Sequence, residues 1–513
     1  MTILIKNILL VDGTNKPAIK TDVLIKRDRI AAIGYFPTYK VDKIIDGMGA
    51  YLTPGFIDIN TNSDLYLNLF SNPSQKEYLM QGVTTIIGGQ SGISLAPLLY
   101  GSLDLNKFWA DVKKLNVNWH TVKEFVKNIK CKKFGVNFGT LVGYSTVREA
   151  LIGNEFRDLT QKELDVFDHI VDRAIKEGVF GVSLDLNFPL TSLATYKEIK
   201  SIAEIIEKNK SLFSIKLRNA SDSTVYLKEI KEKYLSSVEE IVNLSKETGV
   251  RTQINNFSCL TGFEKDYKKS LDLISDSLAT ADICFNLHPY DISVLPIFYF
   301  LPVWAQRGNF SEILNNLKSK ELVAKIKKDL PLLKADDIKI FQAPQHEYLV
   351  GKSLKDFCVN RELSVKDGLL ELMQMTKLRA ELTYKNLSLK TLKVALQHER
   401  SIVSSSFSGF FMRHPSNVIS QYRQTFDKLF ELVFKEKVIP LELAIKKITG
   451  MPAKQLGIKD RGIIKVGNFA DLVILRESSG IEVVIVNGKV VIENNEFKNN
   501  LSGEILTHAL SKK

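Results

Sequence analysis

Polar side chains stand directly after several short apolar runs of this 513-residue chain. Such runs indicate buried strands, and a barrel of parallel strands carries its functional groups at the carboxyl ends of those strands. We therefore expect these side chains to surround one mouth, where amides and hydroxyls can hydrogen-bond a ligand and cations can bind an anion. The candidates are Asn60, Asn62, the turn Gly88–Gly92, Lys216, Arg218, Asn255, Asn256 and Ser404–Ser406.

The donors that a zinc hydrolase needs are missing from this set. Zinc is held by imidazole nitrogen, thiolate or carboxylate. An asparagine oxygen is a poor substitute, serine keeps its proton at neutral pH, and a lysine ammonium repels a cation. The four cysteines form no CxxC pair, and the histidines form no HxH, HxxH or HExxH pair. The histidines are His120, His169, His288, His346, His398, His414 and His508.

The sequence also does not support a phosphate-binding loop or a serine nucleophile. The turn GGQSG lacks the lysine and the following serine or threonine of a phosphate-binding P-loop. Ser404–Ser406 lies in no GxSxG elbow and next to no histidine, so the sequence gives this run no sign of a nucleophile.

Helix-then-strand units fill the middle of the chain. Thr160 and Glu163 form a capping box, apolar residues then recur at helical spacing, and Gly178 ends the helix before the strand VFGVSLD. A second helix ends at Gly249 before VRTQINNFS. Repeated units of this length predict a parallel sheet with right-handed crossovers, and enough of them close a TIM-like (β/α)8 barrel.

Both ends of the chain read as strands of one small β-sandwich domain. The run MTILIKNILLVDG alternates like a strand, and Asn487-Gly488 marks a hairpin near the other end. We predict a β domain from residues 1–54 and 455–513, a barrel from residues 55–454, and a charged helical insertion of about residues 301–344 over the barrel mouth.

Several sequence blocks together resemble the N-acyl-D-amino-acid deacylases (D-aminoacylases) of the amidohydrolase superfamily. They are PGFID, GVTTIIGGQSG, EGVFGVSLDLNFP, IKLRN, LPVWAQRG, SIVSSSFSGFFMRHP, ITGMPAKQLGIKDRGIIKVGNFADLVIL and VIVNGKVVIENN. The resemblance runs nearly end to end. It implies the barrel and β domain predicted above, and a zinc-dependent hydrolase that releases a D-amino acid from its N-acyl derivative.

Carried over position by position, the resemblance implies a degenerate site. Asn60 and Asn62 take the positions of two family histidines, and Ser91 takes that of a metal-binding cysteine. Lys216 and Asn256 take the positions of two further histidines, and Ser406 takes that of the catalytic aspartate. On the substrate side, Ser258 and Ser416 replace a lysine and an arginine. The family residues Arg218, Tyr290, His414 and Pro415 are retained, so Lys216, Arg218, Tyr290 and His414 are the ligand-binding candidates.

These substitutions are chemically coherent with one another. Asparagine and serine can hydrogen-bond to each other without burying like charges, which suits a pocket that holds no metal. We expect no metal and no cofactor, although the family would bind zinc. One hypothesis is that the ammonium of Lys216 takes the place of the zinc charge between Asn60, Asn62 and Asn256. The alternative is that Lys216 extends from a strand end into solvent.

The composition limits the partners of the chain. The net charge is +12, but the lysines are scattered without a basic run or interleaved aromatics, which does not favour nucleic-acid binding. No 18-residue apolar run or signal-peptide pattern appears. We therefore expect a cytoplasmic protein without a membrane partner.

Three functions remain open from the sequence. The first is a pseudoenzyme that has lost its zinc site and binds a protein partner or a small acyl-amino-acid-like ligand. The second is an active amidohydrolase that cleaves N-acyl-D-amino acids through a rewired site with Lys216, Arg218 or His414. The third is a structural subunit of a homo-oligomer.

Overall fold

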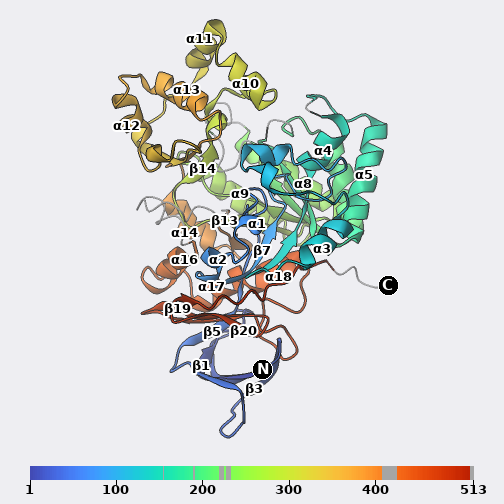
Figure 1. The fold of residues 1–513 in the computed structure, drawn as a ribbon, viewed down its shortest axis with the longest axis vertical. Helices are drawn as coiled ribbons and strands as arrows, with labels where there is room; N and C mark the ends of the chain where they lie inside the picture. The colour runs from blue at the N-terminus through green and yellow to red at the C-terminus, as the bar shows by residue number, and fades with distance from the viewer. Residues whose placement is uncertain (154, 189–190, 219–224, 227–232, 407–424, 509–513) are drawn as a thin grey trace.

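The computed structural model describes residues 1–153, 155–188, 191–218, 225–226, 233–406 and 425–508. The β domain lies at one end of the long axis, the barrel lies in the middle, and a smaller helical unit lies at the other end (Figure 1). No helix within the described ranges is long and apolar enough to cross a membrane.

The two ends of the chain form one nine-stranded sheet. Its strands are β1 (Thr2–Leu10), β2 (Ile19–Lys26), β3 (Arg29–Gly34), β4 (Lys43–Asp46), β5 (Tyr51–Pro54), β18 (Leu472–Arg476), β19 (Gly480–Val486), β20 (Lys489–Glu493) and β21 (Glu496–Phe497). The order is β21-β20-β19-β18-β5-β1-β2-β3, and β4 pairs with β1. Strand β5 joins the two halves, because it pairs in parallel with β1 and antiparallel with β18. This sheet is the predicted β domain.

The halves of the β domain also share a core and a glycine contact. Ile5 and Val23 from the first half pack in one buried cluster with Ile474 and Ile485 from the second. Gly488 has φ +73° in the hairpin between β19 and β20, and a Cβ atom there would lie 1.9 Å from a backbone oxygen of the β2–β3 turn. Only glycine allows this close approach.

Parallel strands close the central barrel. They are β6 (Phe56–Asp58), β7 (Val83–Gly88), β8 (Asn137–Thr140), β9 (Val142–Gly143), β10 (Gly181–Asp185), β11 (Leu212–Lys216), β12 (Arg251–Ile254), β13 (Ile283–Leu287) and β17 (Ser401–Val403). β8 and β9 are two parts of one strand interrupted at Leu141, which gives eight strand positions in these ranges. The chain after β17 returns to β6 through a bond from Ser406 N to Asn60 O of 3.0 Å. The barrel is the TIM-like fold expected from the sequence.

Helices cover the outside of the barrel (Figure 1). The capping box at Thr160 is confirmed: its hydroxyl accepts from Glu163 N, and the apolar residues after it are buried. The predicted end of a helix at Gly249, with φ +73°, is also confirmed. The helices are α1 (Asn68–Ser71), α2 (Lys76–Leu79), α3 (Val122–Lys130), α4 (Tyr144–Ile152), α5 (Gln161–Lys176), α6 (Tyr196–Lys208), α8 (Tyr234–Thr248), α9 (Glu264–Asp276), α14 (Leu389–Gln397), α16 (Thr425–Phe434), α17 (Leu441–Ile448) and α18 (Gly450–Leu456).

The helical unit is larger than the predicted insertion of residues 301–344. It contains β14 (Ser293–Pro296), α10 (Phe310–Asn316), α11 (Lys320–Asp329), β15 (Ile338–Gln342), α12 (Leu354–Val359), α13 (Val365–Met375) and β16 (Glu381–Tyr384). β16 lies between β14 and β15, so long-range pairing extends the unit in both directions. Its core includes Leu65, Ile93 and Phe188, which follow β6, β7 and β10, so the unit packs over the mouth of the barrel.

Candidate functional site

The six positions where the resemblance implies a degenerate site lie at the carboxyl ends of barrel strands. Asn60 and Asn62 follow β6, Ser91 follows β7, and Lys216 is the last residue of β11. Asn256 follows β12 and Ser406 follows β17. Asn60 is 4% exposed, and the other five side chains are half-buried. These residues therefore belong to the end of the barrel where this fold carries its active sites.

Three of these side chains hydrogen-bond to one another. The amide nitrogen of Asn60 lies 2.7 Å from Asn256 Oδ1 and 3.1 Å from Ser406 Oγ. The hydroxyl of Ser406 donates to Asn256 Oδ1 at 2.8 Å. Asn62 joins them through its amide nitrogen, which donates to the carbonyl oxygen of Ser406 at 3.0 Å. We call Asn60, Asn62, Asn256 and Ser406 the amide cluster.

A buried polar chain continues from the amide cluster into the barrel. Asn286 Oδ1 accepts from Asn256 N at 3.0 Å, and its amide nitrogen donates to Asn255 Oδ1 at 2.6 Å. Asn255 in turn donates to Ser214 Oγ and Gln90 Oε1 at 2.6 and 3.0 Å. Gln90 donates to the backbone oxygen of Ile59 at 2.7 Å. This series of hydrogen bonds links five strands of the barrel, and its buried polar atoms are paired with neutral groups.

Three of the six positions have a left-handed backbone. Ser91, Asn256 and Ser406 have φ values of +55°, +51° and +56°. A side chain disfavours this region by roughly 1–2 kcal/mol, although asparagine tolerates it better than serine. Such strained positions persist only where surrounding contacts hold them, and they gather at functional sites. The turns after β7, β12 and β17 are therefore specified by the fold around them.

Two buried carboxyl groups lie beneath the mouth. Asp58 is 0% exposed and accepts from the backbone nitrogens of Ser405 and Asn60 at 3.2 and 3.3 Å. Burial raises the pKa of Asp58 to about 7, against the lowering effect of these hydrogen bonds. Burial likewise raises the pKa of Asp64 to about 6, and Gly89 N donates to Asp64 at 2.5 Å. A cation bound nearby would lower both pKa values.

The cationic candidates occupy the end of β11 and the turn after it. Lys216 is the register partner of Asp185 in the parallel pair β10–β11, so the two residues lie side by side at the rim. The guanidinium of Arg218 donates to the carbonyl oxygens of Ser192 and Ala194, and it lies 3.6 Å from the carboxylate of Glu240. Arg218 therefore holds the segment after β10 in place.

The remaining candidates are separated from the amide cluster or lie outside the described ranges. Ser91 is half-buried, and no hydrogen bond to the amide cluster is formed by its side chain in the described part of the chain. Tyr290 is half-buried, and its ring centroid lies 6.4 Å from that of His288. His414, Pro415 and Ser416 lie outside the described residues.

The donors at the mouth that lie in the described part of the chain do not fit zinc. Within the described ranges, no group of three or more His, Cys, Asp or Glu side chains could hold a metal ion. The amide cluster offers only neutral oxygens, and Lys216 adds a positive charge at the rim. Neutral amide oxygens lack the basic lone pair or the negative charge that holds zinc at neutral pH.

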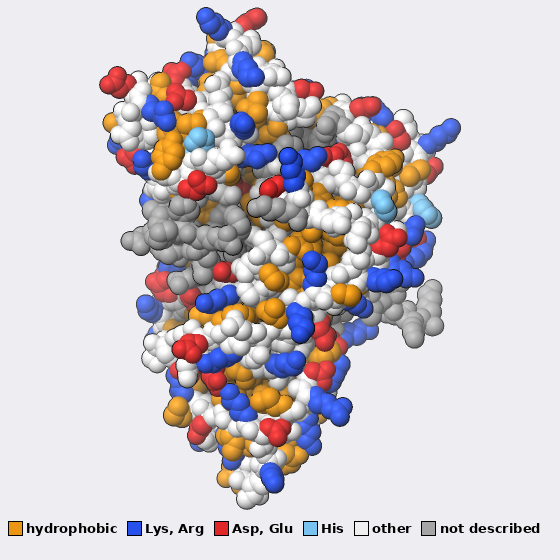
Figure 2. Space-filling model, in the orientation of Figure 1, with side chains coloured by type: hydrophobic (Ala, Val, Ile, Leu, Met, Phe, Trp, Pro, Cys, Tyr) orange, Lys and Arg blue, Asp and Glu red, His pale blue; other side chains and the backbone are white. Residues whose placement is uncertain are grey.

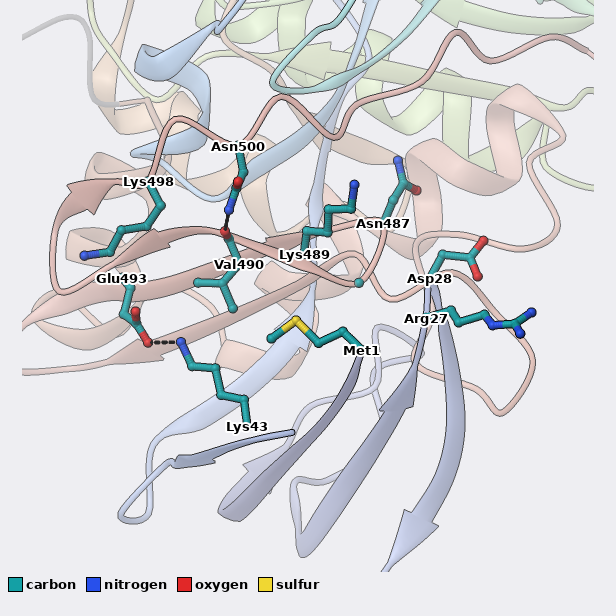
Figure 3. A pocket seen from close by; sticks show the side chains of 11 residues that line it. Met1, Arg27, Asp28, Lys43, Asn487, Lys489, Val490, Glu493, Lys498 and Asn500 are labelled. Carbon is teal, nitrogen blue, oxygen red and sulfur yellow. Dashed lines mark hydrogen bonds and ion pairs between the residues drawn. The ribbon is translucent and has the colours of Figure 1, made fainter. Parts of the chain in front are cut away.

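A separate pocket of about 560 Å³ opens in the β domain, away from the mouth (Figure 3). Its cations are partly neutralised, because Lys43 pairs with Glu493 at 2.6 Å and Lys498 pairs with Glu496 at 3.0 Å. Elsewhere on the surface, Lys and Arg side chains are spread among acidic and apolar ones on the face shown in Figure 2. That face shows no continuous basic patch.

The comparisons with known proteins agree with this geometry. Residues 409–492 match the profile of the amidohydrolase family. An N-acyl-D-aspartate deacylase of Alcaligenes xylosoxydans xylosoxydans is 26% identical over 97% of this chain and 93% of its own length. The D-aminoacylase of the same organism is 24% identical over 97% of this chain and 96% of its own length.

Solved structures show the same fold. The N-acyl-D-glutamate deacylase from Bordetella bronchiseptica, complexed with zinc and a phosphonate inhibitor, matches with a TM-score of 0.80 and 20% identity over 99% of both chains. A D-aminoacylase structure matches with a TM-score of 0.78 and 22% identity over 99% of both chains. The chain is therefore similar to D-aminoacylases and related deacylases over nearly its whole length, and it shares their fold. Among these solved structures, one holds zinc and another concerns a binuclear metal centre, whereas the described residues of the amide cluster in this chain offer amides and a hydroxyl.

Two residues of the polar chain, Ser214 and Asn286, were not among the candidates named from the sequence, and Gln90 was included only as part of the turn Gly88–Gly92. Gln90 lies inside the GGQSG turn, and Ser214 lies two residues before Lys216. Because side chains alternate along a strand, that spacing puts Ser214 and Lys216 on one face of β11. Asn286 is a lone polar residue in the apolar strand ICFNL. The spacing of Ser214 from Lys216 and the isolated polar residue Asn286 were visible in the sequence, but the residues with which these side chains form hydrogen bonds were not.

Proposed function

We propose that this chain binds a small amino-acid-derived ligand at the mouth of a D-aminoacylase-like barrel and does not hydrolyse it by the zinc mechanism. The observation that carries the proposal is the amide cluster. Its four residues occupy positions where the resemblance implies metal ligands and the catalytic aspartate, and they hydrogen-bond to one another instead.

The chemistry of the cluster supports this proposal. A hydrolytic zinc site lowers the pKa of a bound water, and an acidic group then moves a proton to the leaving amine. Ser406 stands where the resemblance implies that acid, and a serine hydroxyl is not acidic at neutral pH. A neutral, mutually bonded set also needs no metal to be stable, since it contains no cluster of like charges.

The proposal is tested by three measurements on the full-length protein purified without an affinity tag. Zinc is added during growth and metal content is measured by elemental mass spectrometry. Deacetylation of N-acetyl-D-amino acids is followed by release of the free amine, and binding of the same compounds is measured by calorimetry. We expect binding, no turnover and zinc far below one ion per chain. Near-stoichiometric zinc with turnover that a chelator abolishes would contradict the proposal.

A second candidate is an amide hydrolase that works through a rewired site. The observation that favours it is the similarity to deacylases over 97% of the chain. Lys216, Arg218 and His414 are the groups available for such chemistry. In that case turnover persists in chelator and is lost in Lys216→Met, whereas the exposed control Lys197→Met keeps it. Equal activity in both variants would remove Lys216 from the mechanism.

A protein partner, a homo-oligomer and a cytoplasmic location remain predictions from the sequence. The structural-subunit hypothesis expects a defined assembly that binds no small ligand. Light scattering of the purified chain, together with the calorimetry above, separates it from the ligand-binding proposal. A monomer that binds ligand would contradict the structural-subunit hypothesis.

A further inference from the structure

Two amide oxygens of the cluster receive no hydrogen bond from any residue that the structure describes. The amide nitrogen of Asn60 faces three acceptors, namely Asn256 Oδ1, Ser406 Oγ and Asn286 Oδ1, the last at 3.4 Å. These acceptors set the orientation of the amide, because the opposite orientation would place oxygen against oxygen. Asn60 Oδ1 therefore lies on the other side of the amide from this group.

Asn62 has the same polarity. Its amide nitrogen donates to the carbonyl oxygen of Ser406 at 3.0 Å, and within the described ranges no donor reaches its Oδ1. Asn62 is half-buried at the end of β6, two residues after Asn60. Neither oxygen is among the buried side-chain atoms that lack a partner, so both are reached by solvent and are open to a ligand group that donates a hydrogen bond.

Amide oxygens select a different ligand group from the one that zinc selects. A zinc ion accepts a lone pair and so binds a carbonyl oxygen. An amide oxygen accepts a hydrogen bond and so binds an N–H group. A charged ammonium carries three such donors, and hydrogen bonds to a charged group are roughly twice as strong as neutral ones.

We propose that the mouth binds the free amino group of a small amino acid, whose ammonium donates to Asn60 Oδ1 and Asn62 Oδ1. This inference rests on the ligand-binding role proposed above and adds the group that the site recognises. An N-acyl derivative presents one neutral N–H in place of three charged ones. The chain therefore prefers a free amino acid to the acylated compound that its deacylase relatives are named for.

The test uses three compounds that differ only at one position: D-glutamate, N-acetyl-D-glutamate and glutarate. Calorimetry is carried out on the full-length protein. We expect D-glutamate to bind at least about 10-fold more tightly than N-acetyl-D-glutamate, and glutarate to bind most weakly, because acetylation removes the charge and two of the three N–H donors, and glutarate has no N–H donor. N-acetyl-D-glutamate binding as tightly as D-glutamate would overturn this inference and leave the ligand-binding proposal standing. If none of the three binds, both fall.

Variants at Asn62 assign the effect to the acceptor. Asn62→Leu removes it, and we expect D-glutamate affinity to fall about 10-fold with little change for glutarate. Asn62→Asp keeps the shape and adds a negative charge, so D-glutamate should bind more tightly. The exposed control Asn360→Leu should match the wild type. A D-glutamate affinity that neither Asn62 variant changes would overturn the inference.

Lys216 provides the competing occupant of the same acceptors. If its own ammonium fills them, D-glutamate binds to Lys216→Met and not to the wild type, which would overturn the inference for the natural chain. Binding to the wild type supports it.

Discussion

Asn286 joins Asn255 to Asn256 in the buried polar chain of the barrel. Its side chain is 0% exposed and makes two close bonds: it accepts from Asn256 N at 3.0 Å and donates to Asn255 Oδ1 at 2.6 Å. Asn286→Leu keeps the number and branching of the side-chain heavy atoms and removes both bonds. The buried Oδ1 of Asn255 and the partly buried backbone nitrogen of Asn256 then lose their partner, at about 1–3 kcal/mol each. We expect the free energy of unfolding to fall by about 2–6 kcal/mol, as the sum of these two losses.

The effect should be local as well as global. Hydrogen–deuterium exchange at the backbone amide of Asn256 should accelerate by at least about 10-fold, since 1.4 kcal/mol corresponds to a factor of ten. Urea unfolding gives the global value. Asn286→Asp keeps the acceptor oxygens and should retain most of the protection at Asn256. Asn360→Leu makes the same chemical change at an exposed site and should leave both readouts unchanged. A loss below 1 kcal/mol in Asn286→Leu would refute the view that this chain of amides stabilises the barrel.

Three further sets of substitutions test the buried carboxyl group Asp58, the Gly488 hairpin and the assignment of the site residues. Burial raises the pKa of Asp58 from 3.8 to about 7, so the contribution of Asp58 to stability is present below pH 4 and is lost as the pH rises to 7. In urea unfolding, the free energy of unfolding of Asp58→Asn relative to the wild type should therefore increase by about 4 kcal/mol between pH 4 and pH 8. A difference between the two proteins that does not change with pH would contradict the burial effect. Gly488→Ala should destabilise the β domain by about 1–3 kcal/mol or more, because φ at this position is +73° and a Cβ atom would lie 1.9 Å from a backbone oxygen. A melting temperature equal to that of the wild type would show that the β2–β3 turn moves away from the added methyl group without loss of stability. Introducing the six residues that the resemblance implies should raise the zinc content toward one ion per chain, measured by elemental mass spectrometry. The substitutions are Asn60→His, Asn62→His, Ser91→Cys, Lys216→His, Asn256→His and Ser406→Asp. An unchanged zinc content would show that the position-by-position assignment is wrong.

Local signals predicted many individual elements. The capping box at Thr160 and the helix end at Gly249 depend on nearest neighbours, and both are present. The hairpin at Asn487-Gly488 is also present, because its φ values of +48° and +73° suit those two residues. The limits of the helical unit were not visible in this way. They depend on pairing between β14 and β16, about 90 residues apart, and no local pattern specifies that partner.

The sequence by itself determined which chemical groups stand at the site. Residue types are read directly, so the amides of Asn60 and Asn62, the hydroxyl of Ser406 and the ammonium of Lys216 were evident where the resemblance implies zinc ligands and a catalytic aspartate. Tertiary structure alone decided what those groups do to one another. The direction of each amide depends on the acceptors that surround it, and Asn60 meets Asn256 and Ser406 only because the barrel closes. The same closure buries Asp58 and raises its pKa. Hydrogen bonds and burial act through distances in space, and the fold sets those distances.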